Sequence, residues 1–181
     1  MHLEEKTLSS EQKFDGKIVK LYVDSVELED GKKSFREVIK HPGGVCVLPM
    51  DEEGNVLFVR QFRYPHKKVL LEIPAGKLEY GENPSECGIR ELKEETGCTC
   101  DRYEYLGSLI PTPAYCGEVI HMYLARGLHY GEQKLDSGEF LDIEKIPLDR
   151  AVEMIMNNEI EDSKTQIAVL KTRLKLDSER A

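Results

Sequence analysis

The residues best suited to chemistry are glutamates near the middle of the chain. Glu91 and Glu95 stand four positions apart, with Glu94 beside them, in a segment whose pattern predicts a helix. Side chains four apart share a helical face, with Cβ atoms about 5–6 Å apart, so like charges there repel. A bound cation would neutralise them, and hard oxygen ligands favour Mg²⁺ or Mn²⁺ over zinc. The spacing therefore indicates a divalent-metal site.

The competing interpretation is a solvated acidic helix face. Two neighbouring features count against it. The preceding residues 73–76 are apolar and include a glycine, which indicates a backbone pressed close to something. Glu82, just before the helix, adds a further carboxylate. Arg90, four residues before Glu94, can hold that side chain in place.

The helix that carries these residues has clear boundaries in the sequence. Asn83 is a good N-cap, Pro84 suits the first helical position, and Glu86 completes a spacing like that of a capping box. Gly97 is placed to end the helix. We therefore expect a helix from residue 84 to residue 96.

Apolar runs bounded by turn residues predict the strands around this helix. A hairpin is expected from residues 14–28, through a turn at Asp30 and Gly31, to residues 34–41. Helices are expected from Pro147 to about residue 157 and after residues 162–163, the last with Ile167, Leu170 and Leu174 on one face. Helices and strands mix without regular alternation, which favours helices around a mixed sheet. The other expected strands are 45–48, 56–64, 69–73, 103–110, 119–125 and 140–143.

Composition limits the classes of protein. The chain has 181 residues, enough for one domain or one domain with a small appendage. Its formal charge of −9 argues against a nucleic-acid-binding protein. No stretch approaches the roughly 18 apolar residues of a membrane span, and no signal peptide or phosphate-binding P-loop is expected. The chain has 5 cysteines, an odd number, so a disulfide framework is not expected and the setting is expected to be reducing and cytoplasmic. Cys98 and Cys100 have no second cysteine pair at ligand spacing, so no zinc site is expected.

In order, Gly76, Glu82, residues 90–92, residues 94–95 and Gly97 occupy fixed spacings. This pattern resembles the Nudix box, with every charged and glycine position present. Two positions depart from it: the last is usually aliphatic and here is Cys98, and Gly88 stands where alanine is commoner.

The resemblance covers about residues 14–160 and is similar to the ADP-ribose pyrophosphatase branch of that family. It implies an α+β fold, an α/β/α sandwich on a mixed sheet in residues 43–181. Residues 1–42 would form a small N-terminal antiparallel β domain that dimerises. The segments that carry the resemblance outside the box are residues 41–45, 59–64, 71–77 and 111–118.

The implied activity is Mg²⁺-dependent hydrolysis of ADP-ribose to AMP and ribose 5-phosphate by a homodimer, with Mn²⁺ as a possible substitute. Two alternatives stay open. One is hydrolysis of another nucleoside diphosphate sugar, because the box detects only metal and diphosphate. The other is a nucleotide-binding Nudix module without turnover, which usually lacks a box carboxylate; none is missing here.

The resemblance also implies roles for residues. Glu91 and Glu95 would coordinate metal together with the carbonyl of Ala75. Glu94 would ligate metal directly or through water, and Arg90 would orient Glu94. All of these positions lie in or beside the box.

Other site predictions rest on less specific motifs. Arg60 and Arg63 would hold phosphate or stack on adenine, unless they only form salt bridges on a surface strand. Arg36 resembles a position that reaches the ligand, and Glu118 one that contacts a ribose. Phe14 and Tyr22 fit hairpin packing better than adenine stacking.

Glu139 is predicted to take the proton from water. It lies in a polar, glycine-containing segment, residues 135–141, that precedes an apolar strand, as a closing loop would. Asp136 is the second choice, and an ordinary solvated loop acid is the alternative. If the loop is not involved, the base would be a box carboxylate, Glu94 first.

Overall fold

The computed structural model describes residues 2–180, except for the side chain of Arg180. The chain divides into two compact units. One consists of Met1–Gly43 with Ile110–Val119, and the other of Gly44–Leu109 with Ile120–Ala181. The first boundary, after Gly43, falls next to the one expected at residue 42. Residues 110–119, which were expected in the larger domain, belong to the smaller unit.

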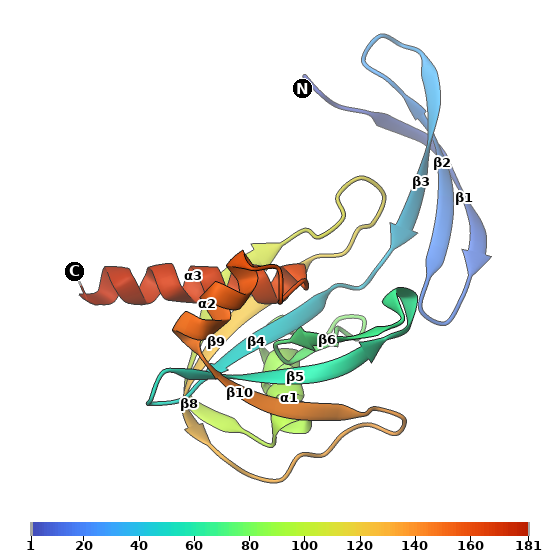
Figure 1. Ribbon diagram of the computed structural model, residues 1–181. Helices are drawn as coiled ribbons and strands as arrows, with labels where there is room; N and C mark the ends of the chain where they lie inside the picture. Colours follow the sequence, from blue (N-terminus) through green and yellow to red (C-terminus); the bar gives the residue numbers. More distant parts are fainter. Residues whose placement is uncertain (1, 181) are drawn as a thin grey trace. The chain divides into compact units, whose positions relative to one another are not determined.

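The smaller unit holds a three-stranded antiparallel sheet in the order β1-β2-β3 (Figure 1). Its strands are β1 (Lys6–Asp15), β2 (Lys20–Glu27) and β3 (Lys33–Lys40). The expected hairpin is β2–β3, with Gly31 in its turn at a φ of +79°, although residues 14–15 belong to β1. Strand β1 was not predicted, because all its residues are exposed and it has no apolar alternation. It is held by backbone pairing.

The second segment of this unit lies along β3. The backbone N–H of Ile39 donates to the carbonyl of Tyr115 at 2.7 Å, and the N–H of Gly117 donates to the carbonyl of Ile39 at 2.9 Å. Residues 110–119 therefore extend the edge of the small sheet over a short stretch.

The larger unit is built on a seven-stranded mixed sheet. The main order is β10-β5-β4-β9-β8, with β6 paired to β5 and β7 paired to β4. Strands β4 and β9 run parallel, and the other pairs are antiparallel. The bounds are β4 (Gly44–Met50), β5 (Asn55–Arg63), β6 (Lys68–Glu72), β7 (Ala75–Lys77), β8 (Thr99–Leu109), β9 (Ile120–His129) and β10 (Leu141–Pro147), with a 3-10 turn, η1 (Tyr64–His66), between β5 and β6.

Three helices complete this unit: α1 (Pro84–Thr96), α2 (Leu148–Met156) and α3 (Ser163–Arg180). The predicted caps of α1 are confirmed. Asn83 accepts a hydrogen bond from the N–H of Ser85 at 2.9 Å, and Gly97 ends the helix at a φ of +72°. The predicted starts of α2 and α3 are confirmed as well.

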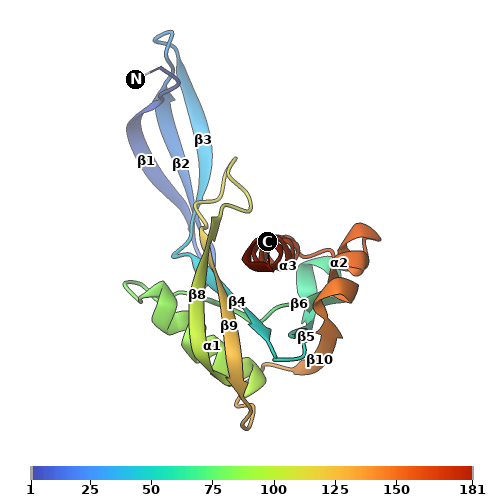
Figure 2. The same ribbon diagram turned by 90° about the vertical axis from the view of Figure 1, so that its left-hand side faces the viewer.

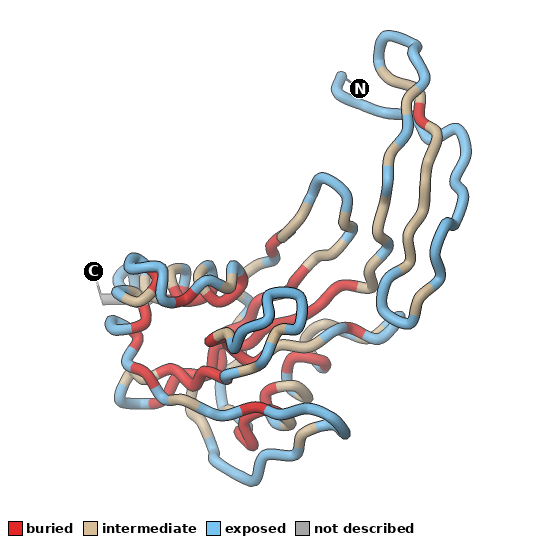
Figure 3. Tube along the Cα trace, turned by 45° about the vertical axis from the view of Figure 1, so that its right-hand side comes forward, coloured by how far each residue is buried: buried red, intermediate tan, exposed pale blue. Residues whose placement is uncertain are grey.

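The helices cover both faces of the sheet, which confirms the predicted sandwich (Figure 2). Along β4, Cys46 and Leu48 pack with residues of α2 and α3, and Val47 packs with Leu92 of α1. This alternation along one strand places two apolar layers on opposite sides, as side chains of a strand with both faces covered must do. Figure 3 shows the buried residues concentrated in these central strands and the facing helix turns.

The packed face of α3 differs from the expected one. Ile167 is 37% exposed and Leu174 is 70% exposed. Leu170 packs against the core as expected, but besides Lys164, which pairs with Glu72, the buried positions are Thr165, Ala168, Val169 and Thr172. Small side chains there let the helix lie close to the sheet, which a search for the largest apolar residues does not detect. Within residues 2–180, no helix is long and apolar enough to cross a membrane.

Candidate active site

A close contact between β7 and α1 forms the centre of the site. Gly76 lies opposite Val45 in the pairing of β7 with β4. A Cβ atom on Gly76 would lie 2.0 Å from Oε1 of Glu91, so any side chain there would displace the carboxylate of Glu91. The N–H of Ala75 donates to Oε2 of Glu95 at 3.1 Å. The strand backbone is therefore pressed against two box carboxylates, as the apolar, glycine-bearing segment predicted.

Of these carboxylates Glu95 is buried and Glu91 is half-buried, and the surroundings of both disfavour their charged forms. Burial raises the pKa of Glu95 to about 8, with the charges of Glu91 and Glu139 adding and the N–H of Ala75 opposing. Burial also raises the pKa of Glu91, and the neighbouring charge of Arg90 opposes that rise. Two acids that resist ionisation side by side leave a place where a cation would be strongly favoured.

Arg90 links the carboxylates along the helix. Its Nη1 lies 2.9 Å from Oε2 of Glu94 and 2.7 Å from Oε1 of Glu91. Its Nη2 also lies 3.3 Å from Oε1 of Glu82. The expected contact with Glu94 is present, and the arginine holds two further box acids.

Glu139 lies near the same carboxylates. Its charge contributes to the raised pKa values of both Glu91 and Glu95. The loop is turned by a hydrogen bond from the N–H of Glu139 to the carbonyl of Asp136 at 3.0 Å. Glu139 therefore lies within electrostatic reach of the box, although the two segments are far apart in the sequence.

The donor set fits a hard divalent cation. The carboxylate of Glu91 occupies the space that a side chain at position 76 would fill, and the carboxylate of Glu95 lies at the backbone of the neighbouring Ala75. Within residues 2–180, no three His, Cys, Asp or Glu side chains converge into a preformed metal-binding group. The carboxylates of Glu91 and Glu94 both pair with Arg90. Oxygen donors of this kind suit Mg²⁺ or Mn²⁺.

Comparison with known proteins identifies the family. Residues 40–166 match the family described as NUDIX domain, and residues 5–39 match the nucleoside diphosphate sugar hydrolase N-terminal domain. The chain is 43% identical over 175 residues to ADP-ribose pyrophosphatase of Bacillus subtilis (strain 168), which covers 96% of this chain and 95% of that protein. The chain belongs to the Nudix family.

Two further similarities extend this assignment. The Nudix chain is 47% identical over 168 residues to a protein of Bacillus methanolicus named methanol dehydrogenase activator, covering 92% of this chain and 91% of the relative. A structure titled "Crystal structure of ADP compounds hydrolase" matches with a TM-score of 0.86 over 97% of this chain and 96% of that one. At 19% identity, this last likeness supports the fold alone.

The predicted arginines of the Nudix domain are both in ion pairs. Arg63 donates through Nε and Nη2 to the two carboxylate oxygens of Glu72 at 2.6 and 2.7 Å. Glu72 is 2% exposed and also pairs with Lys164. Burial alone would raise the pKa of Glu72, but these two cations hold it below its ordinary value. Arg60 pairs with Glu144 at 2.5 Å.

Arg63 is the better placed of the two arginines. Its positive charge lowers the pKa of Glu95, so it lies within electrostatic reach of the Nudix box. Its partner Glu72, at the end of β6, was not among the predicted site residues; the pairing of β5 with β6 brings the two side chains together.

Arg36 and Glu118 belong to the smaller unit. The guanidinium of Arg36 pairs with Glu5 and donates to the carbonyl of Phe35 at 2.7 Å. Glu118 lies 3.6 Å from Nδ1 of His41. Each of these predicted ligand contacts therefore has a partner within its own unit.

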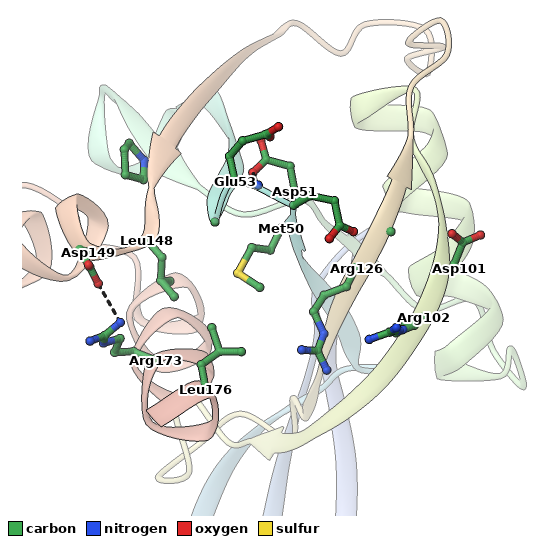
Figure 4. Close-up of a pocket in the computed structure, with 14 residues that line it drawn as sticks. Met50, Asp51, Glu53, Asp101, Arg102, Arg126, Leu148, Asp149, Arg173 and Leu176 are labelled. Atoms are coloured by element: carbon green, nitrogen blue, oxygen red, sulfur yellow. Dashed lines mark hydrogen bonds and ion pairs between the residues drawn. The ribbon is translucent and has the colours of Figure 1, made fainter. Parts of the chain in front are cut away.

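A separate hollow of about 450 Å³ lies at the opposite end of the sheet, beyond the last residue of β4 (Figure 4). None of the predicted site residues lines it. Two of its three arginines, Arg126 and Arg173, are already paired: Arg126 bonds to Glu104 at 3.1 Å through Nε. Arg173 lies 3.0 Å from Asp149. The side chains around it include Met50, Asp51, Arg126, Leu148, Arg173 and Leu176.

Proposed function

We propose that the protein hydrolyses the diphosphate bond of ADP-ribose, giving AMP and ribose 5-phosphate, with Mg²⁺ as cofactor and Mn²⁺ as a substitute. The observation that carries this proposal is a pair of carboxylates against one strand: half-buried Glu91 lies against Gly76, and buried Glu95 accepts from the N–H of Ala75. Such a pair needs a cation, and a bound cation attracts a diphosphate. The choice of ADP-ribose follows the relative that is 43% identical over nearly the whole chain.

The residues divide the work as follows. Glu91, Glu95 and the carbonyl of Ala75 would hold the cation, and Arg90 would keep Glu94 beside them. Bound divalent cations offset the charge of the diphosphate and lower the pKa of water. Water then adds to one phosphorus as its proton passes to Glu139, and the bridging P–O bond breaks to release the two monophosphates.

The remaining roles concern the ligand and the assembly. Arg60 and Arg63 would bind the phosphates, and Arg36 and Glu118 would contact the nucleoside end of the ligand. We place the protein in the cytoplasm as a homodimer that assembles through the domain of residues 1–42. The ion pairs of Arg60 and Arg63 leave some guanidinium hydrogens free for a phosphate.

A panel of substrates tests the proposal. ADP-ribose, a GDP-sugar and a second nucleoside diphosphate sugar are incubated with Mg²⁺, with Mn²⁺ and with EDTA, and the products are resolved by chromatography. We expect AMP and ribose 5-phosphate from ADP-ribose, no product with EDTA, and recovery when metal is restored. If the GDP-sugar is turned over faster, it and not ADP-ribose is the substrate. Ligand binding without any product would favour the non-catalytic alternative.

A second candidate function follows from the relative named methanol dehydrogenase activator, because its identity of 47% is as high as that of the pyrophosphatase. In this case the protein would raise the rate of an alcohol dehydrogenase. The panel is repeated with a methanol dehydrogenase present. A rate increase that the Glu95→Gln variant still produces would separate activation from hydrolysis.

A further inference from the structure

The loop that carries Glu139 is fastened at its base to the last turn of α1. Nε2 of Gln133 donates to the carbonyl of Glu95 at 2.7 Å. The backbone N–H of Lys134 donates to the carbonyl of Glu94 at 2.9 Å. Carbonyls in the last turn of a helix have no partner within the helix. Residues 133 and 134 therefore cap α1, and α1 in turn holds the start of the loop.

A glycine contact brings the two backbones together at this point. A Cβ atom on Gly97 would lie 2.4 Å from the carbonyl oxygen of Gly131, and one on Gly131 would lie 2.9 Å from that of Gly97. Gly97 also has a φ of +72°. Any side chain at either position would push the loop base away from the helix, so the close approach depends on both glycines.

The far end of the loop is fixed by β10. Leu141, the first residue of that strand, is buried and pairs with Gln61. Between the two anchors lie residues 135–140, nearly all of them exposed. A Cβ atom on Gly138 would meet no atom within 4 Å. Within the loop, the N–H of Asp136 donates to Oε2 of Glu139 at 3.2 Å and the N–H of Glu139 to the carbonyl of Asp136 at 3.0 Å. These bonds fix Glu139 within the loop turn, and the anchors fix the turn relative to the box.

We propose that Gln133 is a positioning residue: its bond to the carbonyl of Glu95 sets where Glu139 lies relative to the box carboxylates. This inference rests on the proposed function, because it assumes that Glu139 accepts the proton of the attacking water. Without the bond, Lys134 still holds the loop base through its backbone. The loop stays attached, but Glu139 is aimed less accurately, and small misplacements of a reacting group cost rate.

The variant Gln133→Ala tests the proposal, with Gln166→Ala as its matched control. Nε2 of Gln166 also donates to a backbone carbonyl at 2.7 Å, that of Ile160, away from the loop. We expect Gln133→Ala to lower kcat by about 10- to 100-fold with little change in KM. Gln166→Ala should keep the wild-type kcat. Equal kcat values for the two variants would overturn the proposal.

Combining Gln133→Ala with Glu139→Gln shows whether the effect passes through Glu139. In the Glu139→Gln background, Gln133→Ala should cause no further loss of kcat, whereas a full additional loss would overturn the positioning role. A wild-type kcat for Glu139→Gln would overturn the base assignment and this role together, with hydrolysis itself intact. If Glu139→Gln is slow and Gln133→Ala is not, only the positioning role is wrong.

Amide hydrogen exchange measures, without any substrate, how firmly residues 133 and 134 are attached to α1. The amide of Lys134 should exchange slowly in the wild type and at least several-fold faster in Gln133→Ala, with no change in Gln166→Ala. An unchanged rate would overturn the anchor. This readout holds even for a protein that cleaves no diphosphate, so failure of the anchor and failure of the proposed function are distinguishable.

Discussion

At the scale of single residues, the site combines features that oppose stability. Glu95 is almost fully buried, and its nearest acidic neighbours raise its pKa further. Gly76 leaves room for Glu91 but contributes no packing of its own. A site that binds a polyanion through a metal holds several carboxylates close together before the metal binds. Their mutual repulsion lowers the stability of the folded protein until a cation neutralises it.

Glu95 should make the metal-free protein less stable as pH rises. Its pKa is about 8 when folded and near its ordinary value of 4.5 when unfolded. Between these values the folded state holds a proton that the unfolded state has lost, so stability falls as pH rises. In EDTA, Glu95→Gln should therefore be more stable than the wild type at pH 8, by about 1 kcal/mol or more, and should lose activity.

Thermal unfolding in EDTA from pH 5 to pH 8 measures this effect. The wild-type Tm should fall across the range, and the Tm of Glu95→Gln should change less. The exposed glutamate of the Arg150–Glu153 pair supplies the control, because Glu153→Gln should follow the wild-type curve. Parallel curves for wild type and Glu95→Gln would show that folding does not raise the pKa of the Glu95 carboxyl.

At the scale of elements, sequence patterns identified features that depend on neighbouring residues and missed contacts between segments far apart in the chain. The caps of α1 and the spacing of its glutamates depend on neighbours within a few residues, so both were predicted. Strand β1 has no apolar periodicity and could not be predicted. The pairing of Arg63 with Glu72, and of Gln133 with Glu95, depends on which strands and loops meet. Such contacts have no signature in a single sequence.

Gly88 shows how packing explains an unusual residue in the box. A Cβ atom there would lie 2.0 Å from the hydroxyl oxygen of Tyr103 and 3.4 Å from its Cζ. That hydroxyl is buried and has no hydrogen-bond partner within residues 2–180. The ring of Tyr103 stacks on that of Tyr123 at 4.6 Å, which holds it against α1. The tyrosine hydroxyl, with Cγ2 of Val47 at 3.3 Å from the same Cβ position, therefore accounts for the glycine.

A double-mutant cycle tests this contact. Gly88→Ala alone should destabilise the protein by about 1–3 kcal/mol, because the added methyl group meets the hydroxyl. In a Tyr103→Phe background the same change should be neutral, or stabilising by up to about 1 kcal/mol, since alanine favours helix. Urea unfolding gives the free energies. Equal effects of Gly88→Ala in both backgrounds would show that the hydroxyl is not the obstacle.

At the scale of the whole molecule, the small unit buries too little apolar surface to be stable by itself. Among its described residues, Val26 is the only buried hydrophobic side chain. Phe14, Ile18 and Phe35 are 57%, 58% and 65% exposed. Sheets of so few strands need a covered apolar face to be stable in water. A second copy of the chain would supply that cover, in keeping with the homodimer that we propose.

Light scattering on the intact chain should therefore report about twice its mass of 20.7 kDa. Phe35→Glu places a charge on the uncovered face and should shift the protein toward a monomer, because burying an unpaired charge in an interface is costly. Met156→Ser is the control, since Met156 is similarly exposed, at 71% against 65% for Phe35, but lies on α2 of the larger unit. If substrate contacts such as Arg36 act across the dimer, Phe35→Glu should also raise KM for ADP-ribose. A monomeric wild type with full activity would remove both the dimer and the part assigned to Arg36.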